Sequence, residues 1–222
     1  MIGRSRERSG GWDGEDIAMD TAAKAHQPWN KGLIVGQKRP LLPRQVWSIR
    51  VRLEMSAPAR DLALFNLAID SKLRASDLVR LKVEHVCSGD VVRDRAIITQ
   101  LKTGRPVQFE ITEVTRQSIE RLIAVQSLSN GYLFRSRAHG QAHISSRQYA
   151  RIVHRWISSI GLDDRGFGTH SLRRTKATLI YRRTGNLRAV QLLLGHTKIE
   201  STVRYLGIEV DDALAIAEQV DV

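Results

Sequence analysis

The sequence of 222 residues has one cysteine, Cys87, and no long apolar run. A single cysteine excludes a disulfide framework and a cysteine-rich zinc module, and it fits a reducing compartment. No apolar run approaches the ~20 residues that a membrane-spanning helix requires, and residues 1–30 contain no apolar signal region. These absences predict a soluble, cytoplasmic protein without a membrane partner.

Acidic residues are in the minority, because 23 Asp and Glu stand against 35 Lys and Arg and leave a net charge of +12. Such an excess favours a polyanionic partner over an acidic protein or a neutral metabolite. Residues 1–30 are close to neutral, whereas residues 165–188 contain basic side chains and no acidic one. We therefore expect nucleic acid as the partner. The candidate DNA-binding residues are Lys31, Lys38, Arg39, Arg174, Lys176, Arg182 and Arg183.

The chain divides by composition into four parts. Residues 1–28 are rich in glycine and lack an apolar period, which predicts a disordered tail. Residues 29–45 alternate proline, glycine and cations, which is typical either of a basic arm along phosphates or of a linker packed on the surface. Residues 46–208 are expected to form one principal domain. Residues 209–222 predict an amphipathic helix that packs on its own domain or is exchanged between protomers.

Hydrophobic spacing in the principal domain predicts a mainly α-helical fold with one small antiparallel β-hairpin. Strands are expected over residues 91–101 and 106–111, with Lys102 at the tip of the hairpin. Ser76 is expected to cap a short helix through Leu81. Longer helices are expected over residues 46–70, in two pieces, and over residues 113–126 and 146–160. Another is expected to run from a cap at Thr169 or Ser171 to about residue 184. Two more are expected from the cap Asn186 to Leu194, with Gly195 as the stop, and from about residue 199 to Tyr205.

The spacing of His170 and Arg173 indicates a phosphate-binding pair. Three residues apart on a helix, both side chains share one face near the positive N-terminal end. The planar guanidinium fork matches two phosphate oxygens, which a lysine point charge does not. Breaking a phosphodiester without a metal requires such cations, a nucleophile and an acid for the leaving oxygen. The sequence offers candidates for each role.

The segment THSLRRTKATLIYRRTGNLRAVQLLLGHTKIESTVRYL resembles the C-terminal half of the catalytic domain of tyrosine recombinases, the phage-integrase family. The ordered signature of that family is Arg, a hairpin Lys, His-x-x-Arg, His or Trp, and Tyr. KLRASDLVRL and LKTGRPV match its first two positions, and HSLR and LLGHTKIESTVRYL match the others across residues 57–207. The matching residues are Arg74, Lys102, His170, Arg173, His196 and Tyr205.

The resemblance implies a site-specific recombinase that cleaves and rejoins duplex DNA through a 3′-phosphotyrosine. Tyr205 would attack the phosphorus, and His170 would accept its proton, because a phenol with a pKa near ~10 needs a base at neutral pH. Lys102 would protonate the leaving 5′-oxygen.

The remaining matched residues would act electrostatically. Arg74, Arg173 and His196 would neutralise charge on the phosphoryl oxygens. Asp77, at the acidic position of the first box, would brace the site rather than react. No cofactor and no metal ion is expected, since His139 and His143 flank Gly140 in a polar loop without carboxylate or cysteine partners.

The resemblance also implies assembly on DNA, as a dimer on one site and a tetramer in synapsis, in association with the nucleoid. Most family members carry a core-binding domain before the catalytic domain. Few residues precede residue 57, so we expect that domain to be absent here, as in short single-domain integrases and phase-switch invertases. The arm at residues 29–45 or an accessory protein would then take its place.

Three other functions fit parts of the same pattern. A type IB topoisomerase-like enzyme would nick and reseal DNA with the same residues. A DNA-binding regulator would keep the fold and no longer cut. A metal-independent ribonuclease would use His170 and His196 as an acid–base pair.

Overall fold

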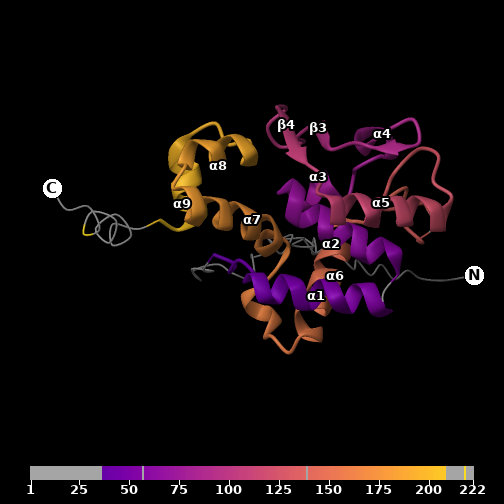
Figure 1. The fold of residues 1–222 in the computed structure, drawn as a ribbon, viewed down its shortest axis with the longest axis horizontal. Helices are drawn as coiled ribbons and strands as arrows, with labels where there is room; N and C mark the ends of the chain where they lie inside the picture. Colours follow the sequence, from indigo (N-terminus) through magenta and orange to yellow (C-terminus); the bar gives the residue numbers. More distant parts are fainter. Residues whose placement is uncertain (1–36, 57, 139, 209–217, 219–222) are drawn as a thin grey trace, which may run out of the picture. The chain divides into compact units, whose positions relative to one another are not determined.

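The computed structural model describes residues 37–56, 58–138, 140–208 and 218, and these belong to one compact unit (Figure 1). The predicted tail, residues 29–36 of the arm, Lys31 and the predicted terminal helix over residues 209–222 lie outside the described residues, apart from residue 218. Among the described residues no helix is long and apolar enough to cross a membrane.

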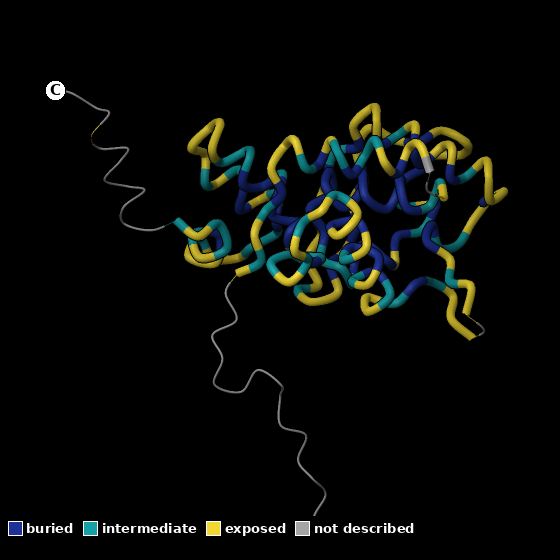
Figure 2. Tube along the Cα trace, turned by 90° about the horizontal axis from the view of Figure 1, so that it is seen from below, coloured by how far each residue is buried: buried dark blue, intermediate teal, exposed yellow. Residues whose placement is uncertain are grey.

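Two helices open the domain, and the second is its centre. Helix α1 spans Pro43–Ser56 and α2 spans Ala59–Ser71, which confirms the two predicted helical pieces. Helix α1 begins earlier than predicted, because residues 43–45 are already helical. Proline suits the first helical position, where its missing N–H would have no partner. Helix α2 is buried from Asp61 to Ser71. Buried segments, dark blue in Figure 2, run through the middle of the domain.

A β-hairpin carries the lysine predicted at its tip. Strands β3 (Arg95–Thr99) and β4 (Pro106–Glu110) pair antiparallel, with Ile98 opposite Val107. Alternate side chains face the interior, as period-2 spacing requires. Lys102 lies in the turn between the strands, as predicted.

The predicted strand over residues 91–101 is interrupted. Its first part is β2 (Val91–Val92), which pairs with β1 (Cys87–Ser88) in a separate two-stranded sheet. Helices α3 (Ala75–Leu78) and α4 (Val83–Val86) precede it. The N-cap position of α3 is held by Arg74 without a side-chain cap, so the prediction that Ser76 caps this helix is wrong.

Helices α5 (Glu113–Gln126) and α6 (Ser146–Ser159) complete the main core, close to their predicted bounds. The Ser145 hydroxyl accepts a hydrogen bond from the Gln148 N–H and caps α6. The i, i+3, i+4 spacing predicts six apolar side chains on one face of α6, and five of them are buried: Tyr149, Ile152, Val153, Trp156 and Ile157. The sixth, Ile160, is half-buried at the C-cap of the helix.

The last part of the domain consists of the short 3₁₀ turn η1 (Asp164–Gly166) and helices α7 (Thr169–Thr184), α8 (Leu187–Leu194) and α9 (Ile199–Leu206). Neither Thr169 nor Ser171 is the N-cap of α7, which begins after Gly168. The Ser171 hydroxyl, in the first turn, accepts the Gly168 N–H instead. Asn186 caps α8 and Gly195 ends it with φ +67°, both as predicted.

The hydrophobic interior has two parts. The larger one is built around α2, and Leu172 of α7 contributes to it. A smaller cluster of Ala177, Val190 and Leu194 joins α7 to α8, and the Tyr205 ring of α9 packs against it. Helix α8 also contacts β4 and lies beside the hairpin in Figure 1. This contact brings the hairpin turn and the end of α9 to the same region.

Buried charges connect α7 to the rest of the domain. Lys176 Nζ lies 2.6 Å from Asp70 Oδ1 of α2 and 2.6 Å from Glu110 Oε1 of β4. The fully buried Lys72 pairs with Glu110 at 2.8 Å. A buried charge is tolerated only when it is paired and hydrogen-bonded, and this network meets that condition.

Candidate active site

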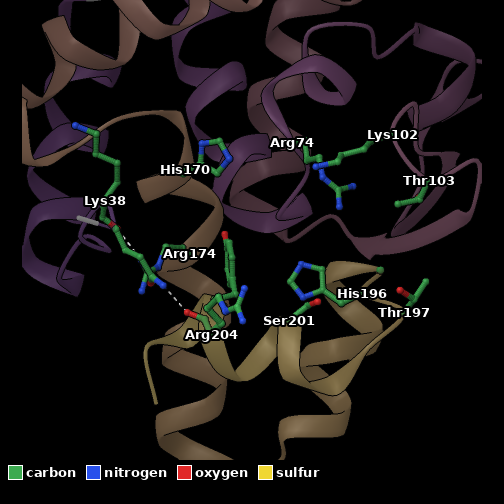
Figure 3. A pocket seen from close by; sticks show the side chains of 13 residues that line it. Lys38, Arg74, Lys102, Thr103, His170, Arg174, His196, Thr197, Ser201 and Arg204 are labelled. Carbon is green, nitrogen blue, oxygen red and sulfur yellow. Dashed lines mark hydrogen bonds between the residues drawn. The ribbon is translucent and has the colours of Figure 1, made fainter. Parts of the chain in front are cut away.

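One pocket of about 510 Å³ collects side chains from segments that are far apart in the chain (Figure 3). Arg74 and Lys102 reach it from the segment before α3 and from the hairpin turn, and His170 reaches it from α7. His196 and Tyr205 come from the loop before α9 and from α9 itself. The sixth predicted residue, Arg173, has its guanidinium carbon 5.8 Å from the centre of the Tyr205 ring. The structure thus brings all six residues together.

The Tyr205 side chain is held on several sides. Its ring stands edge-on to the His196 ring, with 5.4 Å between centres, and the Arg174 guanidinium carbon lies 5.5 Å from its centre. Its hydroxyl is buried without a well-formed hydrogen bond to any described residue. Burial raises the pKa of Tyr205 to about 12, although Arg173 and Arg174 oppose this rise. The phenol is therefore protonated at neutral pH and needs a base to become a nucleophile.

His170 meets the electrostatic requirement for such a base. Burial lowers its pKa below the ordinary value of a histidine, and the nearby charges of Arg173 and Arg74 lower it further. The imidazole is therefore neutral at pH 7 and has a lone pair that can accept a proton. Its position in the first turn of α7 places it in the same pocket as Tyr205.

His196 is neutral as well, which refines the charge assigned to it from the sequence. Burial, followed by the charges of Arg173 and Arg74, lowers the pKa of His196 to about 4. Its Nδ1 lies 3.1 Å from Oγ1 of the buried Thr202, which orients the ring. In the free protein His196 thus presents a neutral hydrogen-bonding ring rather than a cation.

The two arginines are anchored by one nitrogen each. Arg74 Nη1 donates to Gln100 Oε1 at 2.6 Å, and Arg173 Nη2 donates to the Leu194 carbonyl at 2.9 Å. Nη1 of Arg173 is buried and has no hydrogen bond within the part of the chain that the structure describes. An unpaired buried guanidinium nitrogen is costly, and an anionic oxygen in the pocket would satisfy it.

The hairpin turn is braced from α3. Asp77 is buried, and its Oδ1 accepts the N–H of Leu101 at 3.0 Å, directly before Lys102. This contact agrees with the bracing role expected for Asp77. Lys102 itself is exposed at the rim of the pocket, where its ammonium can reach a bound group.

The predicted DNA-binding residues occupy different settings. Lys38 lines the pocket, with its Nζ 2.5 Å from the Arg165 carbonyl, and Arg174 is buried and donates to the Lys38 carbonyl. Lys176 is held in the ion pairs with Asp70 and Glu110, so its charge is already neutralised inside the protein. The N–H of Arg39 donates to the Gly166 carbonyl. Arg182 and Arg183 are exposed in the last turn of α7.

One residue of the site, Gln100, was not singled out in the sequence. It is 1% exposed and contacts Arg74, although a polar side chain is rarely so buried. A signal for it exists, since Ala96, Ile98 and Gln100 share the inward register of the hairpin. A glutamine on that register requires polar partners inside the protein.

Metal ligation finds no support among the residues that the structure describes. Within those ranges no group of three or more His, Cys, Asp or Glu side chains could hold a metal ion. Of the two loop histidines, His143 is described and His139 is not.

The chain belongs to the phage integrase family, because the family model matches residues 41–210. Among its curated relatives is the probable integrase/recombinase YoeC of Bacillus subtilis, 33% identical over 70% of this chain and 82% of that protein. The tyrosine recombinase XerC of Erythrobacter litoralis is 28% identical over 73% of this chain. The chain spans 51% of the length of that XerC.

Solved structures of recombinases share the fold. XerA recombinase superposes with a TM-score of 0.67 at 18% identity, covering 83% of this chain and 65% of its own. XerH site-specific recombinase, bound to its difH substrate, superposes with a TM-score of 0.65 at 19% identity, and the match covers 82% of this chain and 54% of the XerH chain. The predicted family and the predicted tyrosine recombinase fold, mainly helical with small antiparallel sheets, are both confirmed.

Proposed function

We propose that this protein is a site-specific DNA recombinase that cleaves and rejoins duplex DNA through a 3′-phosphotyrosine intermediate. The observation that carries the proposal is the convergence of Tyr205, two arginines, two neutral histidines and a hairpin lysine at one pocket. The related XerH and lambda integrase structures hold a difH substrate and a COC′ core site, which supports duplex DNA as the substrate.

Each step of the cleavage has a candidate group. Tyr205 Oη attacks the phosphorus while the bond from phosphorus to the 5′-oxygen breaks. His170 takes the phenolic proton, and the Lys102 ammonium gives a proton to the leaving oxygen. Arg173 Nη1, buried and without a partner among the described residues, and the Arg74 guanidinium bind the non-bridging oxygens. Donors of this kind are each worth about 10²–10³ in rate.

The same arrangement favours rejoining. The phosphotyrosine keeps the phosphoryl group activated, so attack by a free 5′-hydroxyl reverses the cleavage without another source of energy. Rejoining to a different strand yields recombination. The proposed reaction therefore needs no cofactor. The nucleoid is the proposed place of action.

Binding to DNA is proposed to involve cations around the pocket. Lys38 lines it, and Arg39 follows Lys38 directly, whereas Arg182 and Arg183 are exposed on α7. We leave Lys176 out of this surface because its charge is paired. A dimer on one site and a tetramer in synapsis are proposed as the active assemblies.

Covalent capture tests the proposal directly. Wild-type protein is incubated with nicked duplexes whose central base pairs are randomised, and adducts that survive denaturation are recovered, amplified and sequenced. A shared sequence identifies the site. Trypsin cleaves after Arg204 and leaves a peptide of residues 205–222 in which Tyr205 is the only hydroxyl-bearing side chain. We expect the nucleotide on this peptide.

The opposite result would favour another function. Duplexes that are bound without any adduct would support a regulator that no longer cuts. An adduct on a different peptide would remove Tyr205 from the reaction. Cleavage of RNA alone would support the ribonuclease alternative.

The pH dependence of cleavage tests the role of His170. The pKa of His170 is lowered, so the half-protonation that removes the base is reached below the ordinary pKa of about 6.5. Single-turnover cleavage on the recovered site should therefore reach its half-maximal rate below pH 6.5. DNA affinity measured at each pH serves as the control. A half-maximal rate above pH 6.5 at constant affinity would contradict the assignment.

A further inference from the structure

Gln100 directly follows strand β3, lies two residues before Lys102 and has an almost fully buried side chain. Its Oε1 accepts a hydrogen bond from Arg74 Nη1 at 2.6 Å and another from Thr103 Oγ1 at 3.0 Å. Thr103 directly follows Lys102 in the turn. One oxygen atom therefore contacts both the first arginine of the site and the turn that carries the lysine.

The nitrogen of the same amide points to the other side of the site. Gln100 Nε2 lies 3.4 Å from the carbonyl oxygen of Leu194, the last residue of α8. That carbonyl also accepts the 2.9 Å hydrogen bond from Arg173 Nη2. Through the Leu194 carbonyl, Gln100 is linked to the second arginine.

Gly195 makes this close approach of the hairpin to α8 sterically feasible. A Cβ atom on Gly195 would lie 2.5 Å from Val107 Cγ2 and 3.1 Å from both terminal atoms of the Gln100 amide. The residue also has φ +67°, which favours glycine. The backbone of α8 thus ends against the Gln100 side chain because no side chain separates them.

We propose that Gln100 is a positioning residue that sets the Arg74 guanidinium, the Lys102 turn and the Arg173 anchor relative to one another. The proposal rests on the proposed recombinase function. Gln100 holds the groups that bind the phosphoryl oxygens and the group that protonates the leaving oxygen in one geometry before DNA arrives. Errors of about 1 Å in such a geometry can cost ~10²-fold in rate.

An amide is the side chain that this place requires. Its oxygen accepts two donors while its nitrogen donates to a carbonyl. A glutamate would lack the donor and would neutralise part of the Arg74 charge that the phosphate needs. A methionine would fill similar space but leave the Arg74 nitrogen and the Thr103 hydroxyl without their acceptor.

The experiment compares Gln100→Met with Gln108→Met, a matched change on the exposed face of β4. Each is given the duplex recovered by covalent capture, once with the natural 5′-bridging oxygen and once with sulfur in that position. A thiolate leaves without protonation, since thiols have a pKa near ~8.5, so sulfur removes the need for Lys102. Two variants set the limits of this comparison. Sulfur should restore the cleavage rate fully in Lys102→Ala and should not restore it in Arg74→Ala.

We expect Gln100→Met to slow cleavage of the oxygen substrate about 10- to 100-fold. Sulfur should restore part of this loss, because the Lys102 contribution is bypassed and the Arg74 contribution is not. Gln108→Met should match the wild type on both substrates. No loss, complete restoration, or no restoration would each overturn the proposed coupling.

A second measurement does not depend on cleavage. The Leu101 and Gly104 amides of the turn are hydrogen-bonded to Asp77 and to the Gln100 carbonyl. Their hydrogen exchange should quicken in Gln100→Met and stay unchanged in Gln108→Met, at equal free energies of unfolding. Unchanged exchange in Gln100→Met would overturn the proposal whether or not the wild type cuts DNA. A wild type that cut no DNA would by itself contradict only the recombinase function.

Discussion

Replacing Tyr205 by phenylalanine is expected to abolish the covalent protein–DNA adduct while the affinity for DNA and the stability of the fold remain unchanged. The nucleophilic oxygen is lost, so no phosphotyrosine can form. The ring keeps its contacts with His196, Arg173 and Arg174. The lost hydroxyl has no well-formed hydrogen bond to a described residue, so its removal should change the free energy of unfolding by less than about 0.5 kcal/mol.

Tyr181→Phe is the matched control for this experiment. Tyr181 lies on α7 and packs against the same small cluster of Ala177, Val190 and Leu194 as Tyr205 does. Denaturing gels of labelled DNA report the adduct, gel shifts report the affinity, and urea unfolding reports the stability. The control variant should form adduct at the wild-type rate. An adduct with Tyr205→Phe would show that another residue attacks the phosphorus.

Replacing Asp70 by alanine is expected to lower the free energy of unfolding by about 3–5 kcal/mol, the usual cost of removing one partner from a buried ion pair. Asp70 Oδ1 accepts a 2.6 Å hydrogen bond from Lys176, and Oδ2 accepts hydrogen bonds from Thr112 and Thr115 at the start of α5. The change removes all of these contacts at once. It also leaves Lys176 with Glu110 as its partner, which Lys72 shares.

The effect of Asp70→Ala should depend on pH in a definite direction. Burial alone would raise the pKa of Asp70, but the hydrogen bonds from Lys176, Thr112 and Thr115 outweigh burial and lower it. A carboxylate with a lowered pKa stabilises the fold above its unfolded pKa of about 3.9 and loses this effect as the pH falls through its folded pKa. The difference between wild type and variant should therefore be complete at pH 7 and shrink below about pH 4.

Urea titrations from pH 3 to pH 7 measure this difference. Asp90→Ala is the control, because Asp90 is exposed in the turn between β1 and β2 and its loss should cost less than about 0.5 kcal/mol. A loss below 1 kcal/mol for Asp70→Ala at pH 7 would contradict the stabilising role of the network. A difference that grows on acidification would contradict the direction of the pKa shift.

The sequence alone predicts the elements that carry the site, and the reason is local. Helix α6 follows from the spacing of its apolar side chains, and α8 follows from an asparagine cap and a glycine stop. The turn that presents Lys102 follows from alternating residues on both sides of a Thr-Gly-Arg segment. Short elements such as α4 and β1 were not predicted, because a few residues contain too little periodicity.

Six polar residues of the site were likewise predicted, because their identities and order are properties of the chain itself, whereas Gln100 was missed. What the tertiary structure alone decided is the environment of each side chain. Lys176 reads as a surface cation in a basic segment, yet two carboxylates from α2 and β4 neutralise it. His196 is neutral because burial, and then the charges of two arginines from distant segments, lower its pKa to about 4.

The surroundings of Gln100 also depend on the tertiary structure, since its partners belong to the segment before α3, to the hairpin turn and to α8. Local propensity and residue order determined which groups this protein has and on which elements they lie. Burial, charge state and hydrogen-bond partners depend on distances between residues far apart in the chain, so only the packed fold could determine them.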